Sequence, residues 1–402
     1  MFEIKGKVNT AVCYAKTADE ASVGQIEKMC DCDFTKGSKI RIMPDVHAGK
    51  GCTVGTTMTV SDRVAPSIVG VDIGCGMYTV KLGSARIDLE KFDDAAHSVP
   101  CGREVWQEPV EKFDLEGLRC FEKLKHQSRL ERSLGTLGGG NHFIEIDVAE
   151  GGTAYLIIHS GSRNLGKQVA ELYQGLAADL DAGKTDIIAG RNEIIRAYKE
   201  QGRSTEIQAA LKAFENEQKA KKPTMPAELC CLHGTYLDDY LHDTKLCQEF
   251  ARRNREIIAD TLLKMTGMTA LSSFHTVHNY IDTDEMILRK GAIAAHGGEL
   301  VLIPMNMRDG SILARGRGNP DWNFSAPHGA GRLMSRAKAR ATLDMDDYRN
   351  AMDGIYTTSV NKFTIDEAPM AYKPLCDITD VIGETVDIIE ILKPLYNYKA
   401  SE

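Results

Sequence analysis

The sequence has no excess of positive charge. Its 402 residues include 49 lysines and arginines against 57 aspartates and glutamates, which gives a formal net charge of −8. Proteins that bind nucleic-acid backbones without regard to sequence usually carry a strongly basic surface. The charge balance therefore excludes a protein that coats nucleic acid through its overall charge, and it leaves room for a local basic site.

Long apolar runs and a disulfide framework are also missing. No segment approaches the roughly 18 apolar residues that cross a membrane, and residues 1–30 lack a basic stretch leading into an apolar one. We therefore expect no membrane span, no export signal and a cytoplasmic protein. The eleven cysteines are an odd number without regular spacing, which fits a reducing compartment where thiolates are free for metal binding or catalysis.

Internal repeats, low-complexity tracts and Pro- or Ser-rich linkers are absent as well, which argues against a chain of independent modules. Residues 166–267 have the apolar spacing of helices, and a further helix is expected to begin near Gly329. Short β-branched runs predict strands, among them 67–73, 143–148, 154–159 and 300–304. Candidate site residues lie on both sides of the helical block. We therefore predict a mixed α+β fold in which residues 1–402 form one large domain, with a composite β core and a helical insertion at about 166–267.

Six motifs collect side chains that bind metals or transfer protons. They are MPDVHAGKG (43–51), VGVDIGCGM (69–77), LGTLGGGNHFIEI (134–146), IHSGSRNLG (158–166), FHTVHNYID (274–282) and PHGAGRLMSR (327–336). Glycines at these joints allow close backbone approach, so the side chains can face a shared pocket. Neither G-x-G-x-x-G nor a Walker A motif occurs, so a bound nucleotide would be held by an unrelated arrangement.

Three of these motifs point to a metal. Asp72 and Cys75 are three residues apart in a glycine-bent turn, so a carboxylate and a thiolate can converge on one ion, and a thiolate can bridge two. The alternative is a buried cysteine beside a capping aspartate. His142 and His159 at predicted strand ends favour the metal. Cysteine with histidine suits Zn, Cu or Fe, while the carboxylate and imidazoles also accept Mn.

His275 and His278 are three residues apart, a spacing that fits neither one face of a strand nor a helical pair. One is therefore expected to be a ligand and the other structural. We favour His278 as the ligand because Asn279 follows it directly and can orient it.

The last motif suggests an anion site. His328 begins a Gly-X-Gly turn, and Arg332 and Arg336 are four residues apart on one face if a helix begins near Gly329. A helix N-terminus with an arginine pair can hold a phosphate near the imidazole. The alternative is a capping histidine with solvated arginines. Residues 308–340 carry seven cationic side chains and two acidic ones, a local charge of +5.

Taken together, the motif set resembles the RtcB family of RNA ligases from about residue 41 onward. The segments DEAPMAYK (366–373) and LKPLYNYK (392–399) belong to the same resemblance. Met305-Asn306-Met307-Arg308 stands where well-known members have Gly-Ser-Met-Gly, and HTVHN replaces a more common adjacent His pair. These departures resemble a divergent bacterial branch of the family.

The resemblance implies an enzyme that joins RNA 3′-phosphate or 2′,3′-cyclic phosphate ends to 5′-hydroxyl ends through a GMP–histidine intermediate, in RNA repair or tRNA splicing. His328 would be the guanylylated residue, with Asp45 and Arg332 at the same centre and Arg163 in the phosphate path. Two Mn²⁺ ions would be held by Asp72, Cys75, His142, His159 and His278. GTP, the co-substrate, would contact Asn141, Phe143, Glu145, Asn306, Ser311 and Lys399. The implied partners are RNA ends and GTP, without an obligate protein partner.

Two alternatives remain at this point. A dinuclear metallophosphoesterase would use the same metals to activate water and would hydrolyse RNA ends without joining them. An RNA-end-binding protein without catalysis is disfavoured because every proposed ligand and His328 are present. Asn306, in place of the serine found at the nucleotide, keeps the phosphoesterase open.

Overall fold

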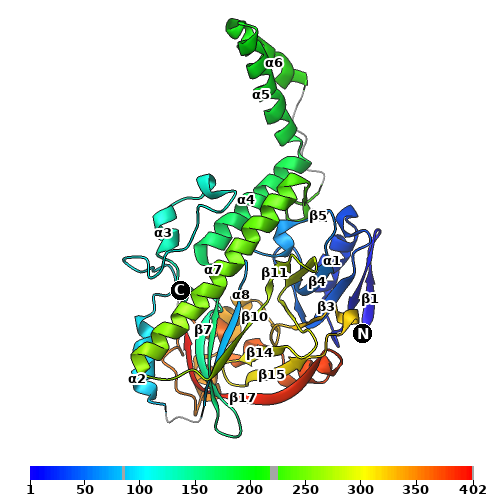
Figure 1. Ribbon diagram of the computed structural model, residues 1–402. Helices are drawn as coiled ribbons and strands as arrows, with labels where there is room; N and C mark the ends of the chain where they lie inside the picture. The colour runs from blue at the N-terminus through cyan, green and yellow to red at the C-terminus, as the bar shows by residue number, and fades with distance from the viewer. Residues whose placement is uncertain (84–86, 218–224, 401–402) are drawn as a thin grey trace.

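The computed structural model describes residues 1–83, 87–217 and 225–400 (Figure 1). Helices and strands are interspersed along it, and two large sheets contain most of the strands. This is the mixed α+β architecture that the sequence predicts. None of the described helices combines the length and apolar character that a bilayer crossing requires.

The first sheet is built mainly from the N-terminal part of the chain. Its six strands, in spatial order, are β1 (Phe2–Lys5), β2 (Thr10–Cys13), β3 (Ile40–His47), β4 (Val54–Thr59), β12 (Ile287–Lys290) and β11 (Asn279–Asp282). Neighbours pair antiparallel except β2 and β3, which are parallel. The motif at 43–51 begins on β3, and the segment that follows His278 is β11. Because β3 pairs with β4, β4 with β12 and β12 with β11, the two lie in the same sheet.

The second sheet is antiparallel throughout and carries most of the motif strands. In spatial order it contains β10 (Ser272–Val277), β6 (Gly76–Gly83), β8 (Ala154–Ser160), β7 (Phe143–Val148), β17 (Val386–Lys399), β15 (Gly310–Gly316) and β14 (Leu300–Asn306). The strand predicted at 143–148 is confirmed, and those predicted at 154–159 and 300–304 extend slightly further. Two short pairs join β13 (Ala292–Ala294) to β16 (Ser325–Pro327) and β5 (Arg63–Val64) to β9 (Leu232–His233).

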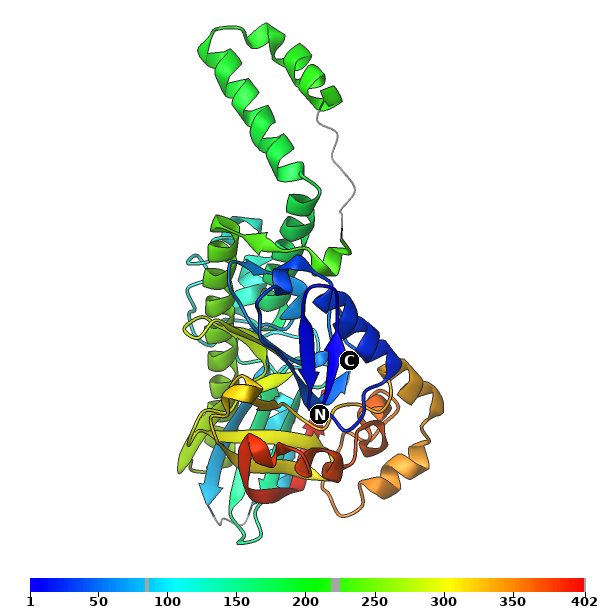
Figure 2. The ribbon, with the colours of Figure 1, turned by 90° about the vertical axis from the view of Figure 1, so that its right-hand side faces the viewer.

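The helices flank these sheets. They are α1 (Glu20–Cys30), α2 (Leu89–Ser98), α3 (Gln127–Glu131), α4 (Arg163–Asp181), α5 (Lys184–Glu200), α6 (Ile207–Glu217), α7 (Thr235–Thr266), α8 (Arg336–Thr342), α9 (Met345–Ala351) and α10 (Leu375–Thr379). On α7, Ile258 and Leu262 are buried in one apolar cluster with Leu156 and Ile158 of β8, so the apolar spacing in this part of the sequence marks a buried helix face. Helices α5 and α6 project away from the sheets (Figures 1 and 2).

Two local predictions are wrong. Residues 67–73 do not form a strand: a short 3₁₀ turn at Pro66–Ile68 is followed by a loop in which Gly70 and Gly74 have φ of 100° and 75°. The glycines turn the chain there, which β-branched composition alone does not reveal. The helix expected near Gly329 begins instead at Arg336, where the Ser335 side chain accepts a hydrogen bond from the Lys338 amide and caps it.

The predicted helical block is interrupted in the structure. Helices α4 to α7 span Arg163–Thr266, but β9 lies between α6 and α7. Residues 218–224, which fall in the same block, lie outside the described residues.

Candidate functional site

Most of the predicted site residues line one cavity of about 390 Å³. Those on its wall are Asp72, Cys75, Asn141, Phe143, Glu145, His159, His278, Asn306, His328, Arg332 and Lys399. Of the remaining three, His142 contacts Cys75, Asp45 contacts His328, and Ser311 is fully buried on β15 outside the lining. The volume is in the range that small-molecule sites occupy.

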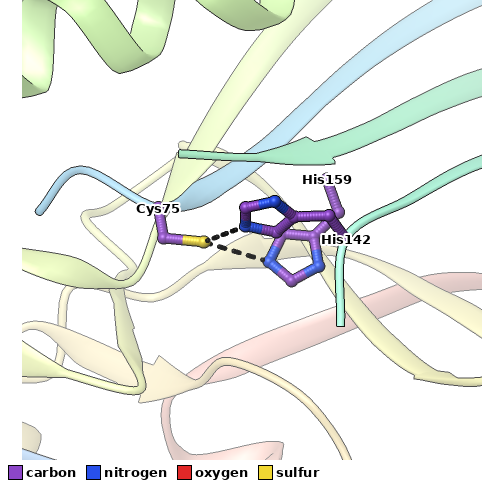
Figure 3. A group of neighbouring side chains, drawn as sticks. All are labelled: Cys75, His142 and His159. Atoms are coloured by element: carbon purple, nitrogen blue, oxygen red, sulfur yellow. Dashed lines mark hydrogen bonds between the residues drawn. The ribbon is translucent and has the colours of Figure 1, made fainter. Parts of the chain in front are cut away.

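A thiol and two imidazoles form the innermost cluster (Figure 3). Cys75 Sγ lies 3.3 Å from His159 Nε2 and 3.5 Å from His142 Nε2, and the three side chains are buried. Asp72 Oδ2 lies 3.0 Å from His142 Nε2. Cys75 directly precedes β6. His142 directly precedes β7, and His159 lies near the end of β8. Sheet pairing therefore brings together residues from three motifs.

Backbone carbonyls orient both imidazoles of this cluster. His142 Nδ1 donates to the Leu137 carbonyl at 2.8 Å, and His159 Nδ1 donates to the Asn141 carbonyl at 3.0 Å. A carbonyl only accepts, so in the neutral rings the proton is on Nδ1 and Nε2 keeps its lone pair. Metal-binding histidines are commonly held in this way.

His278 stands next to this cluster and next to His328. Its ring centroid is 5.1 Å from that of His159 and 4.8 Å from that of His328. Burial lowers the pKa of both His159 and His278 well below the ordinary value, so both are neutral, as metal binding requires. Within the described residues, nothing hydrogen-bonds to the buried Nδ1 of His278. Together with a thiol and a carboxylate, these donors fit a transition-metal site.

His275 lies apart from that cluster. Its ring stacks on Tyr78 at a centroid distance of 4.4 Å, and its Nε2 is 3.2 Å from Glu256 Oε1 on α7. Burial lowers the pKa of His275 to about 4. The structure thus places His278, the histidine favoured from the sequence, in the cavity wall, and His275 at the sheet–helix contact.

Asp45 and His328 form a tight polar pair. Asp45 Oδ2 accepts hydrogen bonds from His328 Nδ1 at 2.6 Å and from the His328 backbone amide at 3.2 Å. Asp45 is fully buried, and its own carbonyl accepts a hydrogen bond from His47 Nδ1 at 2.9 Å. Burial lowers the pKa of His47 to about 4. With Nδ1 engaged, His328 presents Nε2 as its free nitrogen.

Another group on the cavity wall comes from β7 and β17. The antiparallel register sets Phe143 opposite Lys399 and Glu145 opposite Asn397. Lys399 Nζ lies 5.3 Å from the centre of the Phe143 ring, and Asn397 Nδ2 donates to Glu145 Oε2 at 2.6 Å. Burial, with a smaller contribution from the neighbouring Asp147, raises the pKa of Glu145 well above its ordinary value.

Asn306 lines the cavity at the end of β14 and organises the turn into β15. Its Nδ2 donates to Asp309 Oδ2 at 2.8 Å, and its Oδ1 accepts from the Arg308 amide at 3.0 Å. Arg163 does not line the cavity; its Nη2 donates to the Gly102 carbonyl at 2.8 Å. Arg163 Nε also donates to Thr136 Oγ1 at 3.1 Å, so the side chain contacts the segment that leads to His142.

The predicted basic stretch is partly neutralised by two carboxylates from elsewhere in the sequence. Arg336 Nη1 lies 2.9 Å from both Asp366 Oδ2 and Glu367 Oε1. Arg332 Nη1 is 3.2 Å from Glu367 Oε1, and Arg340 Nε is 3.1 Å from Asp366 Oδ1. The charge of +5 counted over 308–340 therefore overstates the free positive charge, because the partners lie outside the counted segment.

Sequence reasoning did not single out several residues around the cavity. Glu367 is fully engaged: Lys399 Nζ donates to its Oε2 at 2.8 Å and Tyr372 OH donates to it at 2.6 Å. Glu367 and Tyr372 both lie in the DEAPMAYK segment. The resemblance of that segment to the family was the only sign in the sequence that it belongs to the site. Lys290, a buried lysine on β12, also lines the cavity and contacts the Lys50 carbonyl. No sequence signal identified it.

The sequence matches one protein family over nearly its whole length. The model of the family described as tRNA-splicing ligase RtcB matches residues 25–120 and 119–400. The chain is 30% identical over 397 residues to the RNA-splicing ligase RtcB of Escherichia coli (strain K12), covering 89% of this chain and 88% of that protein. It is 26% identical over 416 residues to the tRNA-splicing ligase RtcB of Aeropyrum pernix, covering 85% and 83% respectively. The chain therefore belongs to the RtcB family.

Proposed function

We propose that the protein is an RNA ligase that joins a 3′-phosphate or 2′,3′-cyclic phosphate end to a 5′-hydroxyl end, with GTP as co-substrate and His328 as the guanylylated residue. Membership of the RtcB family supports ligation over a phosphoesterase that hydrolyses RNA ends without joining them. The observation that carries the proposal is the 2.6 Å hydrogen bond between His328 Nδ1 and Asp45 Oδ2, at the wall of a cavity shared with the Cys–His cluster.

Asp45 prepares His328 for nucleophilic attack. Its carboxylate accepts the Nδ1 proton, so the lone pair of the neutral imidazole is on Nε2. Attack by Nε2 on the α-phosphorus of GTP forms an N–P bond and breaks the bond to the bridging oxygen, so pyrophosphate leaves. The positive charge that develops on the ring is stabilised by the buried carboxylate of Asp45.

The ligand set around Cys75 fits a pair of Mn²⁺ ions, held by Asp72, Cys75, His142, His159 and His278. The orienting carbonyls behind His142 and His159 and the unpartnered Nδ1 of His278 among the described residues support this assignment. Metal ions bound there would lower the charge cost of attack on phosphorus. Thiolate and imidazole donors also suit Zn, Cu or Fe, so Mn²⁺ rests on the family resemblance.

The guanylate is assigned to the part of the cavity lined by β7 and β17. Burial raises the pKa of Glu145, but hydrogen bonds from a bound guanine would favour its ionised form. The ionised carboxylate accepts two hydrogen bonds, which matches the ring N–H and exocyclic amine of guanine. Phe143 offers an aromatic face, and Lys399 offers a cation above it. Asn141 and Asn306 supply amide groups at the wall.

RNA joining follows guanylylation. The RNA 3′-phosphate, produced first by hydrolysis where the end is cyclic, attacks the phosphorus of the His328 adduct, breaks the N–P bond and receives the guanylate. The 5′-hydroxyl then attacks the activated 3′-phosphate and GMP leaves. Arg332 lines the cavity and is held by Glu367 and the Asp366 carbonyl, which supports its role in orienting a phosphate.

We also propose that the whole chain works as one domain, with α4 to α7 as an insertion, and that it acts in the cytoplasm without an obligate protein partner. The motifs before and after the insertion contribute to a single cavity. All eleven cysteines are free, which supports a reducing compartment.

The proposal is tested with two short RNAs, one ending in a 3′-phosphate and one beginning with a 5′-hydroxyl. Incubation with the protein, GTP and Mn²⁺ should give the joined product. ATP in place of GTP, and the His328→Ala variant, should not. Conversion of the 3′-phosphate to a 3′-hydroxyl without joining would favour the phosphoesterase and overturn the proposal.

A further inference from the structure

Two adjacent polar residues lie fully buried in the middle of the long helix α7. Asn254 and Arg255 have no exposed surface, although the helix faces an otherwise apolar core there. A buried amide and a buried guanidinium are costly unless they are hydrogen-bonded. Their hydrogen bonds lead to the loops that carry the proposed metal ligands.

Asn254 connects the segment that leads to His142 with the strand end that carries His159. Its Oδ1 accepts from the amides of Gly135 and Thr136 at 2.7 and 3.1 Å, and its Nδ2 donates to Ser160 Oγ at 2.9 Å. Ser160 directly follows His159.

Ser160 extends that connection to a third side chain. Its Oγ donates to the Leu137 carbonyl at 2.7 Å, and the same carbonyl orients His142 Nδ1 at 2.8 Å. The hydrogen bonds therefore run without interruption from Asn254 through Ser160 and Leu137 to His142.

Arg255 connects the loop that carries Cys75 with the strand end that carries His159. Its Nη1 donates to the Gly74 and Ser160 carbonyls, each at 2.8 Å. Gly74 immediately precedes Cys75, so one guanidinium nitrogen joins the thiol loop to the strand end that carries His159. Gly74 has φ of 75°, and a Cβ added there would lie 2.8 Å from the Gln248 Cα of α7. The helix therefore presses directly on the thiol loop.

The charge of Arg255 is placed behind the ligands. Burial lowers the pKa of Arg255 to about 10, still well above neutrality, so the guanidinium is charged. Within the described residues, its buried Nε and Nη2 have no hydrogen-bond partner. The two carbonyls accept only from Nη1 and leave the other donors of the guanidinium unused. Its positive charge would complement the negative charge that Asp72 and Cys75 carry once a metal is bound.

We infer that Asn254 and Arg255 are positioning residues that set the relative geometry of Cys75, His142 and His159 from outside the ligand set. The inference rests on the metal assignment of the proposed function and on no later step of the reaction. It predicts that metal affinity and the metal–thiolate bond depend on two side chains that touch no ligand atom. Residues behind metal ligands typically change affinity by about 10- to 100-fold when replaced.

Cobalt(II) is a suitable probe, because a thiolate bound to it gives a charge-transfer absorption band that requires neither GTP nor RNA. The metal-free full-length protein is titrated with Co²⁺ for wild type, Arg255→Met, Arg255→Lys and Asn254→Ala. The matched control is Arg289→Met. Arg289 is also fully buried, and it donates to Ser325 Oγ at 2.8 Å and to Tyr280 OH at 3.0 Å, so its hydrogen bonds do not go to the segments that carry Cys75, His142 and His159.

We expect Arg255→Met to bind Co²⁺ at least about tenfold more weakly than wild type, with a smaller thiolate band per bound ion. Arg255→Lys, which keeps the positive charge, should recover part of the Co²⁺ affinity and part of the thiolate band. Arg289→Met should lower the melting temperature while keeping wild-type affinity and band in the folded protein. Asn254→Ala gives an independent comparison if Arg255→Met does not fold.

Wild-type affinity and band in Arg255→Met or Asn254→Ala would overturn the inference, as would an equal loss in Arg289→Met. Wild-type protein that binds no Co²⁺ would overturn it together with the metal assignment. Wild-type protein could also fail to be labelled by GTP while the variants still differ from it in Co²⁺ binding. That result would contradict the proposed function and leave the positioning role of Asn254 and Arg255 intact.

Discussion

Asp45 Oδ2 and His328 Nδ1 are 2.6 Å apart, and the same carboxylate oxygen accepts the His328 backbone amide at 3.2 Å. One buried oxygen thus fixes both the ring and the main chain of His328. Asp45 comes from β3 of the first sheet, whereas His328 directly follows β16. The proposed nucleophile and the carboxylate that orients it therefore meet only in the folded chain.

Replacing Asp45 by Asn should abolish most guanylylation while leaving the shape of the site intact. An amide that donates to Nδ1 forces the ring proton onto Nε2, which removes the attacking lone pair. We expect the labelling rate with GTP to fall by about 10³- to 10⁴-fold. The rate of protein-bound label formation measures this. Labelling at more than a tenth of the wild-type rate would contradict the orienting role.

Replacing Cys75 by Ala should remove bound metal and guanylylation together. The thiol lies within hydrogen-bonding distance of both His142 and His159, so its loss leaves the cluster without a central donor. Metal content after dialysis and GTP labelling are measured on the same preparation. Cys247→Ala, which removes a buried thiol on α7, is the control and should retain both. Full metal occupancy in Cys75→Ala contradicts a bridging thiolate.

Replacing Glu145 by Gln should reduce the preference for GTP over ATP. A carboxylate accepts both guanine N–H groups, whereas an amide accepts only one and directs its own donor at the other. We expect labelling with GTP to fall by about 10²-fold, with ATP labelling unchanged or raised. The ratio of the two rates is an internal control for folding. An unchanged ratio would show that Glu145 does not read the base.

The stability of the protein should depend on Glu367 in acid. Burial acts to raise the pKa of this carboxyl, but Lys399 and Arg336 outweigh it and hold the value at about 2. A carboxyl with a lowered pKa stabilises the fold fully above its ordinary value near 4.5, and the contribution disappears as the pH falls from there towards 2. The shift corresponds to about 3 kcal/mol.

Urea unfolding of wild type and Glu367→Gln between pH 7 and pH 3 tests this linkage. The variant should be less stable at pH 7, because Lys399, Arg332 and Arg336 lose a buried partner. The difference should narrow below pH 4.5 as the wild-type carboxylate is protonated. Glu27→Gln, at an exposed site on α1, should behave like wild type throughout. A difference that does not change with pH would contradict the assignment.

Much of the site could be predicted from residue types and local spacing. His142 and His159 stand at the ends of strands that short apolar and β-branched runs predict, so their placement follows from local pattern. Asp45, Cys75 and His328 come from separate glycine-rich joints. Cys75 and His328 line one cavity and Asp45 contacts His328. This arrangement depends on the pairing of distant strands, which the sequence does not show directly.

Long-range pairing is what the sequence could not supply. Arg332 and Arg336 were counted as free charges because Asp366 and Glu367 lie some 30 residues further along. The helix expected near Gly329 begins at Arg336 because Ser335 caps it, and the Gly-X-Gly turn before it is not a helix start. The role of Asn254 and Arg255 was hidden because an apolar stripe on α7 indicates only that the helix is buried.

We propose that His328 carries the guanylate, and isotopic labelling is a direct test of this. The protein is incubated with α-labelled GTP and Mn²⁺, and the label is followed through denaturing electrophoresis, acid and alkali. We predict wild-type label that is lost in acid and stable in alkali, as expected for a phosphoramidate, and no label on His328→Ala. Absence of label on wild-type protein across several metals, or undiminished label on His328→Ala, would contradict the claim.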